Sequence, residues 1–102
     1  MTLSLQMKII LLQSSRKDKK LQIIVRGKSV HFGARGMSDY TIHKDQLRKQ
    51  RYINRHQSNE NWTSTGIETA GFWSRWLLWN KPNLKDSIKD IEKRFNLTIQ
   101  ID

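Results

Sequence analysis

The chain has 102 residues, which is enough for one small domain with a single core. Its 19 Lys+Arg outnumber nine Asp+Glu, and the formal net charge of +10 favours polyanionic partners such as nucleic acid or an acidic protein surface. Because there is no cysteine, disulfides, thiolate zinc sites and cysteine nucleophiles are excluded, and no apolar run reaches the roughly 18 residues that a membrane-spanning helix needs.

The N-terminal third of the chain predicts a β-sheet. Apolar residues that first alternate and then run together predict a strand over residues 3–12. Residues 21–26, which are rich in β-branched side chains, predict a second strand. Residues 29–32 predict a third strand, joined to the second by a tight hairpin turn at Gly27-Lys28.

The first twelve residues allow two interpretations, which the sequence leaves open. They belong to the fold as an edge strand of the sheet, or they form an arm that pairs with another subunit. A signal peptide is not expected here, because no basic residue precedes the apolar run and Lys8 interrupts it.

Helical patterns begin in the middle of the chain. The segment 33–36, which has a glycine at each end, is expected to break the third strand, and residues 37–44 are expected to form an irregular connector. Asp45 is a good N-cap for a helix over residues 46–56, which has a basic side and a weakly apolar side. Residues 57–64 are polar and predict a loop.

The segment 66–82, GIETAGFWSRWLLWNKP, is the most apolar part of the chain and predicts a helix that packs in the core. One face of this helix, expected to point inward at Trp73 and Leu77, consists of Ile67, Ala70, Trp73 and Leu77. A second row of large side chains consists of Phe72, Trp76 and Trp79. Either the protein's own sheet or a partner is expected to cover the second row, and the choice decides between a self-contained domain and a part of an assembly.

The C-terminal segment predicts a helix and a strand. Asn83 followed by Asp86 is typical of a capping box, and the apolar face of the helix that follows consists of Leu84, Ile88, Ile91 and Phe95. Asn96 is expected to end this helix, and residues 97–101 alternate as a strand does. The order of elements predicts a small single α+β domain over residues 1–102, with an N-terminal hairpin sheet, two or three helices, and a C-terminal strand that joins the sheet.

Most of the excess positive charge lies between residues 16 and 56, where twelve Lys+Arg face three acids. Such a local excess predicts a surface that binds phosphate groups. The candidate nucleic-acid or polyanion-binding residues are Lys17, Lys19, Lys20, Arg35, Arg48, Lys49, Arg51 and Arg55. Tyr52 and Trp62 lie in or beside this region and are candidates for stacking on bases. The alternative is that the run 16–20 is a solvated loop and Tyr52 belongs to the core.

Catalytic patterns in the chain are weak. His56 and Glu60 have the spacing of two residues on one helix face, but a metal site needs three or four converging ligands. A metal-dependent nuclease would suit the positive charge, with candidate residues His43, His56, Asn59 and Asn61. Nothing in their spacing requires that activity, and no glycine-rich phosphate loop is present. We therefore expect a protein that is not an enzyme, with no catalytic residues, no metal and no cofactor.

Several short motifs stand close together between residues 31 and 91. They are His31-Phe32-Gly33, Ser38-Asp39-Tyr40-Thr41, His43-Lys44-Asp45, Arg51-Tyr52-Ile53, Glu60-Asn61-Trp62, Thr69-Ala70-Gly71-Phe72-Trp73-Ser74 and Trp79-Asn80-Lys81-Pro82. Their combination resembles a small family of uncharacterised proteins encoded by large DNA viruses. The resemblance implies a viral origin and little about mechanism, and it leaves the first thirty residues outside.

These observations lead to a first hypothesis and an alternative. The first is a basic structural protein of a virus particle, a minor capsid or core-associated component that contacts other virion proteins and DNA or RNA. Its residues Phe72, Trp73, Trp76 and Trp79 would anchor a core or an interface. It would reside in the virion, and in the host cytoplasm or the viral factory during assembly. The alternative is an intracellular nucleic-acid-binding protein outside the particle, which contacts phosphates through residues 16–56.

Overall fold

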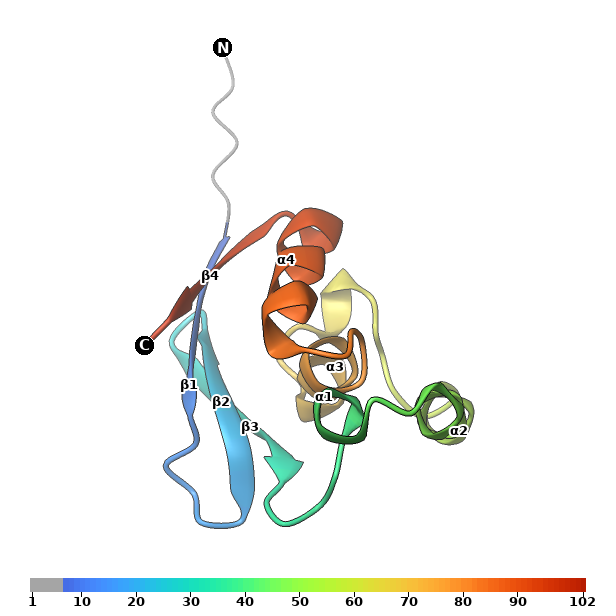
Figure 1. Cartoon of the computed structure of the whole chain (residues 1–102). Helices are drawn as coiled ribbons and strands as arrows, with labels where there is room; N and C mark the ends of the chain where they lie inside the picture. Colours follow the sequence, from blue (N-terminus) through green and yellow to red (C-terminus); the bar gives the residue numbers. More distant parts are fainter. Residues whose placement is uncertain (1–6) are drawn as a thin grey trace.

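In the computed structural model, which describes residues 7–102, one four-stranded sheet packs against a layer of helices (Figure 1). The strands are β1 (Met7–Gln13), β2 (Lys19–Val25), β3 (Lys28–Ala34) and β4 (Leu97–Ile101), in the spatial order β3-β2-β1-β4. β1 pairs antiparallel with β2 and parallel with β4. The predicted α+β class is confirmed, and the C-terminal strand joins the N-terminal sheet as expected.

β1 is an inner strand of this sheet. Met7 pairs with Leu97 on one side, and Ile10 pairs with Ile24 on the other. β1 therefore lies between β2 and β4, with Ile10 and Leu11 paired on both sides, and is neither the edge strand nor the arm that the sequence left open. The remaining part of the predicted strand, residues 3–6, lies outside the described residues.

The hairpin between β2 and β3 has the expected strands, but its turn is one residue earlier than predicted. Val25 pairs with Lys28, so the two turn residues are Arg26 and Gly27 rather than Gly27 and Lys28. Both have positive φ, 52° and 75°, which is the backbone of a type I′ turn. This turn type matches the twist of the two strands, and it explains a glycine at its second position.

β3 continues two residues past its predicted end at Phe32, into the segment that was expected to break it. Gly33 stays in the strand with a φ of 77°, and Ala34 pairs with Lys19. A Cβ built on Gly33 would meet the Cδ1 atom of Leu78 at 2.7 Å. The glycine thus ends no strand; it lets a core leucine pack closely against the sheet.

The helical layer follows β3 in the chain. Its elements are α1 (Tyr40–His43), α2 (Gln46–His56), the 3₁₀ turn η1 (Ser64–Gly66), α3 (Ala70–Trp73), the π-helical turn η2 (Ser74–Leu78) and α4 (Leu84–Phe95). The range predicted for α2 is confirmed. The short helix α1 lies where an irregular connector was expected, because the side chain of Asp39 accepts hydrogen bonds from both the backbone N–H and the hydroxyl of Thr41 and starts a helical turn. None of the helices within residues 7–102 is long and apolar enough to cross a membrane.

The aromatic segment is helical over a shorter range than predicted. The side chain of Thr69 caps the first turn by accepting a hydrogen bond from Phe72 N, so the helix begins at Ala70. Ile67 precedes this helix and cannot share a helical face with Trp73. It still lies in the core, and its carbonyl oxygen accepts a hydrogen bond from Trp73 Nε1 at 2.7 Å.

The core lies between the sheet and this aromatic segment. Trp73 and Leu77 are completely buried, as predicted, whereas Ala70, which was placed on the same face, is exposed because it stands in the first turn of α3. The second row is also largely covered from within the chain, because Phe95 on α4 lies 5.0 Å from Phe72 and 5.4 Å from Trp76, measured between ring centroids. These aromatic side chains act as core anchors of this chain.

α4 has the ends that the sequence predicts. Asn83 Oδ1 accepts a hydrogen bond from Asp86 N, and the Asp86 carboxylate accepts one in return from the amide of the Asn83 side chain. Asn96 ends the helix in the left-handed conformation, with a φ of 55°. The helix therefore stops at the residue that leads directly into β4.

Candidate polyanion-binding surface

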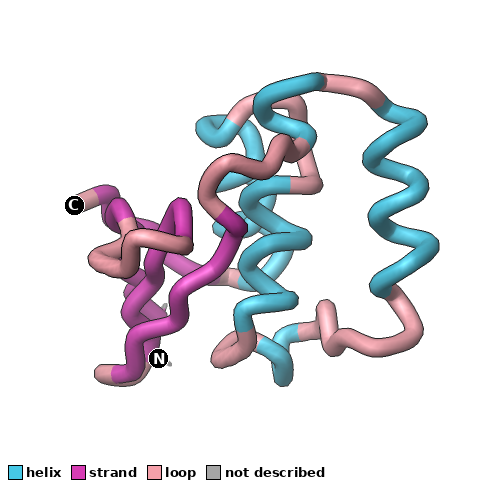
Figure 2. The backbone as a smooth tube through the Cα atoms, turned by 90° about the horizontal axis from the view of Figure 1, so that it is seen from below, coloured by secondary structure: helices cyan, strands magenta, loops and turns pink. Residues whose placement is uncertain are grey.

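α2 is the helix farthest from the sheet in both views (Figures 1 and 2). Asp45 starts it by accepting hydrogen bonds from Leu47 N and Arg48 N. Tyr52 is its only buried residue. With so little of its surface in the core, α2 presents most of its side chains to solvent.

Three arginines form a row on the exposed side of α2. Arg48, Arg51 and Arg55 follow one another at spacings of three and four residues, which places them on one helix face. Together with Trp79 they line a hollow of about 150 Å³. Within residues 7–102, none of these arginines forms an ion pair with an acid. Their charges are therefore available to a negatively charged partner.

A stack of aromatic rings holds α2 against the rest of the domain. The Tyr52 ring lies 4.4 Å from Trp79 with the two planes nearly parallel, and 4.4 Å from His56. The ring of Trp62 lies 6.3 Å away in a nearly parallel plane. Tyr52 is only 6% exposed, and its burial raises the pKa of its hydroxyl well above the usual range. Tyr52 thus has the core position that the sequence left as the alternative to base stacking.

Polar contacts tie the first half of α2 to the loop before α4. Lys49 Nζ donates a hydrogen bond to the Asn80 carbonyl oxygen at 2.6 Å and lies 4.9 Å from the centroid of the Tyr40 ring. Lys44, which ends α1 just before α2, donates from Nζ to the Pro82 carbonyl oxygen. Burial lowers the pKa of Lys49, and repulsion from the neighbouring cations Arg75 and Lys81 lowers it further. Lys49 therefore serves to position α2 and differs from the three exposed arginines.

The region of the domain next to α2 also carries positive charge, and Asp90 is an acid that partly compensates it. Burial raises the pKa of Asp90, but hydrogen bonds from Asn80 and Arg94 outweigh that effect and hold it below its usual range. Asp90 is therefore ionised at neutral pH. It counters part of the charge of Lys49, Arg75 and Arg94 without reaching the arginine row.

The other predicted basic residues lie at the end of the sheet nearest the β1–β2 turn. Arg35 N donates to the Asp18 carbonyl oxygen, which brings Arg35 next to the turn that carries Lys17 and the start of β2 with Lys19. Lys20 differs from these, because its ammonium group is paired with the buried carboxylate of Asp39. Of the four predicted residues at this end, three are therefore available to a partner.

A cleft of about 410 Å³ separates this end of the sheet from α2. Two strands of the sheet, β2 and β3, form one wall of the cleft. The other walls are formed by α2, by η2 and by the connector that precedes α1. The lining residues are Lys19, Lys20, Gly33, Ala34, Met37, Ser38, Asp39, Tyr52, His56, Ser74, Leu78 and Trp79. Trp79 lines both this cleft and the arginine hollow, so the two are neighbours.

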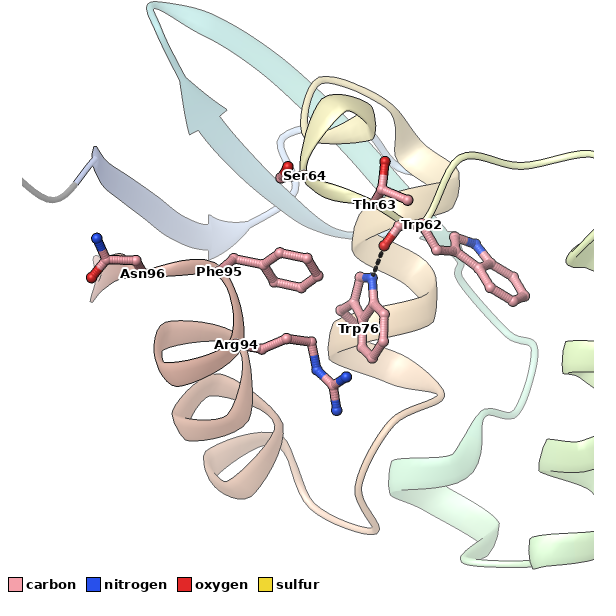
Figure 3. A pocket seen from close by; sticks show the side chains of 7 residues that line it. All are labelled: Trp62, Thr63, Ser64, Trp76, Arg94, Phe95 and Asn96. Atoms are coloured by element: carbon pink, nitrogen blue, oxygen red, sulfur yellow. Dashed lines mark hydrogen bonds between the residues drawn. The ribbon is translucent and has the colours of Figure 1, made fainter.

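A second hollow, of about 560 Å³, lies on another side of the aromatic segment (Figure 3). Trp76 and Phe95 point into it, and Trp76 Nε1 donates a hydrogen bond to the Trp62 carbonyl oxygen at 2.9 Å. The guanidinium group of Arg94 lies 4.5 Å from the Trp76 ring centroid, and that of Arg75 lies 4.5 Å from the same ring and 5.4 Å from Trp62. The Trp62 ring is thus already engaged by a cation and does not line the arginine hollow.

The histidines do not converge on one site. His43 lies 5.4 Å from Trp79, while His56 stacks on Tyr52, so the paired rings of Trp79 and Tyr52 lie between the two histidines. His56 does approach Glu60 at 3.3 Å, as their spacing suggests, but Glu60 also accepts a hydrogen bond from Trp62. No group of three or more residues able to hold a metal ion occurs in the described part of the chain.

The sequence predicted the charge of this surface but missed three of its features. These are the pairing of Tyr52 with Trp79, the inward direction of Lys49, and the cation–π contacts of Arg75 and Arg94. Each joins residues that are distant in sequence, or depends on which side of a helix is covered. The only signal of this geometry in the sequence was the spacing of Arg48, Arg51 and Arg55 by three and four residues.

Comparison with known proteins gives one match. The model of a family of unknown function (DUF5754) matches residues 9–56, which is 48 of the 102 residues. The matched segment contains most of β1 and all of β2, β3, α1 and α2, and therefore both the arginine row and the sheet side of the cleft. It overlaps the resemblance noted above only over residues 31–56, and it includes most of the N-terminal segment that the resemblance left outside. No curated protein and no solved structure matches the chain.

Proposed function

We propose that this protein is a non-enzymatic nucleic-acid-binding protein whose main contact is the row of Arg48, Arg51 and Arg55 on α2. The observation that carries the proposal is that these three arginines are exposed, lie on one helix face, and form no ion pair with an acid among residues 7–102. Guanidinium groups bind phosphate oxygens through two parallel hydrogen bonds, which makes arginine well suited to a phosphate backbone.

The spacing of the row suits a chain of phosphates. At 1.5 Å of rise per residue, Arg48 and Arg55 are separated by roughly 10 Å along the helix axis. That length spans about three phosphates at the 3.4 Å axial spacing of one strand. Lys17, Lys19 and Arg35 extend the positive surface beyond the cleft. A small acidic protein would meet fewer of these charges than an extended polyanion.

The test compares two triple variants that remove the same charge from two helices. Arg48→Gln, Arg51→Gln and Arg55→Gln together neutralise α2, while Lys85→Gln, Lys89→Gln and Lys93→Gln neutralise three exposed lysines on α4. Binding of a labelled oligonucleotide is measured by fluorescence anisotropy over a range of salt concentrations. We expect the α2 variant to reduce the slope of log affinity against log salt by about 2, because each lost phosphate contact contributes about 0.7 for a single strand.

The α4 variant carries the same net charge, so we expect it to keep the slope of the unmodified protein. Equal losses in the two variants would mean that net charge alone drives binding, and the proposal of a defined surface would be wrong. A protein that binds no oligonucleotide at low salt would also refute it.

We further propose that the protein acts beside the genome in a virus particle, as a core-associated component rather than a capsid cement. The resemblance of residues 31–91 to proteins of large DNA viruses supports this location, and the basic surface suits a neighbour of packaged nucleic acid. Phe72, Trp73 and Trp76 are buried within the chain and leave little aromatic surface for a neighbouring subunit. An antibody against this chain should detect it in purified particles; its absence there would leave an intracellular nucleic-acid-binding protein.

A further inference from the structure

We propose that the cleft between α2 and the end of the sheet binds an unpaired nucleobase, so that the protein prefers single-stranded to double-stranded nucleic acid. This inference rests on the proposed function and adds the class of nucleic acid. It concerns the cleft of about 410 Å³ that Lys19, Met37, Tyr52, His56 and Trp79 help to line.

The lining of the cleft suits a flat, partly apolar group with polar edges. Leu78, Trp79 and Met37 supply apolar surface, and Met37 is 65% exposed at the cleft. A methionine adapts its shape to the group that packs on it. Ser38 and Ser74 bring hydroxyl groups to the same space, which can pair with the polar edge of a base. A small-molecule site commonly has this composition and a volume in this range.

His56 adds an imidazole ring at the wall of the cleft. One face of this ring rests on Tyr52, and the side chain keeps 39% of its surface exposed. Glu60 contacts the ring at Nδ1, which holds its orientation. An ordered, half-exposed ring of this kind can stack on a base without much loss of side-chain freedom.

The position of the cleft relates the base to its phosphates. Trp79 separates the cleft from the arginine hollow, and Lys19 lies on the sheet side. A strand that crosses Trp79 would therefore place one base in the cleft, one phosphate on the arginine row and the next phosphate near Lys19. The positive charge of Lys20 is already matched by Asp39, so Lys19 is the lysine of the cleft that remains for a phosphate.

A duplex cannot use this cleft without distortion. Its bases are stacked and paired, and moving one into a protein pocket requires unstacking and unpairing it first. The bases of a single strand are free of that cost. The arginine row should bind both forms, while the cleft should add affinity only for the single strand.

The experiment compares three ligands that share a backbone: a short single strand, the blunt duplex of the same sequence, and the single strand with abasic sites in place of its bases. We expect the unmodified protein to bind the single strand about tenfold more tightly than the other two, as for one stacked base. Ala34→Trp places a bulky side chain at the cleft, because Ala34 is exposed and lines it. This variant should lose the preference and keep its affinity for the duplex.

Gln100→Trp is the matched control, since it adds the same bulk at an exposed position of β4 away from the cleft. If Ala34→Trp fails to fold by circular dichroism, Ser38→Trp fills the cleft from the connector instead. Equal affinity of the unmodified protein for all three ligands would overturn the inference, as would a preference that survives filling of the cleft. If either of those results is found but the α2 triple variant still loses binding, the proposed function stands and only the cleft inference is wrong. If the α2 triple variant keeps its binding, both the cleft inference and the proposed function are wrong.

Discussion

The body of the domain and α2 are held in place in different ways. In the body, the sheet, α3, η2 and α4 bury a continuous apolar core that includes Trp73, Phe72 and Leu77, each completely covered. α2 contributes one buried residue, Tyr52, and depends on stacking with Trp79 and a few polar contacts. Apolar burial thus fixes the fold, whereas α2 is positioned by a small number of specific side chains.

This difference matters for function. A helix that buried a broad apolar face would have to turn most of its other side chains toward its neighbours. Because α2 is fixed to the body at Tyr52 and Lys49, its remaining faces are free to carry charge. Because few contacts hold α2, we expect it to detach from the domain more easily than the elements of the body. Four predictions test the contrast, beginning with the largest expected effect.

Trp73→Ala should destabilise the whole domain. The side chain is fully buried, and its Nε1 donates to the Ile67 carbonyl oxygen, so the change leaves a large cavity and an unpaired acceptor. We expect a loss of about 3–5 kcal/mol in the free energy of unfolding, measured by urea denaturation followed by circular dichroism. Arg55→Ala on the exposed side of α2 is the control and should change it little. A loss below about 1 kcal/mol at Trp73 would contradict the core described here.

Tyr52→Ala should release α2 and leave the sheet intact. Removing the ring deletes the contacts with Trp79 and His56, and we expect the opening free energy of α2 to fall by about 2 kcal/mol. Hydrogen exchange measured by mass spectrometry should show loss of protection over residues 46–56 and unchanged protection in β1 and β2. Tyr52→Phe retains the stacking ring and should behave as the unmodified protein. Equal loss across the sheet would show that α2 is part of the cooperative core.

Gly33→Ala and Gly36→Ala form a pair that separates backbone strain from packing. Both glycines have positive φ, 77° and 90°, and each substitution should cost about 1 kcal/mol from the backbone alone. A Cβ at Gly33 would also press on Leu78, while a Cβ at Gly36 would meet nothing within 4 Å. We therefore expect the Gly33 variant to lose about 1 kcal/mol more than the Gly36 variant in thermal or urea denaturation. Equal losses would show that Leu78 moves aside without cost.

The pH dependence of stability should report the burial of Tyr52. Burial raises its pKa, so the folded chain keeps the proton above pH 10, where the unfolded chain begins to lose it. Stability present below that pH should therefore fall as the pH rises above 10, with a slope from this residue of up to about 1.4 kcal/mol per pH unit. Tyr52→Phe lacks the ionisable group, and its smaller decline isolates the contribution. Identical curves for the two proteins would place the Tyr52 hydroxyl in contact with solvent.

The sequence predicted those elements whose ends are marked locally. Asp45 begins α2 and Asn83 begins α4, because capping depends on residues within one turn. The short α1 was missed although Asp39 caps it locally, because a helix of four residues is too short to show an apolar period. The aromatic helix is also shorter than the sequence predicts. Thr69 caps it from within, so that Ile67 reaches the core before the helix begins.

The candidate surface could be predicted in its charge but not in its geometry. The threes-and-fours spacing of Arg48, Arg51 and Arg55 is a property of the sequence. Which basic residues turn inward is not, because Lys49 and Lys20 find their partners 31 and 19 residues away. The sequence likewise allowed Tyr52 to stack on bases or to pack in the core, and only the position of Trp79 distinguishes the two roles.

Both proposals require that α2 and the cleft beside it bind nucleic acid. Hydrogen exchange of the full chain, with and without a short single-stranded oligonucleotide at low salt, tests it most directly. We expect increased protection over residues 46–56, together with the cleft segments 19–20 and 33–39, and unchanged protection over residues 84–95 in α4. Protection that appears in α4, or none over residues 46–56 when the oligonucleotide is bound, would contradict it.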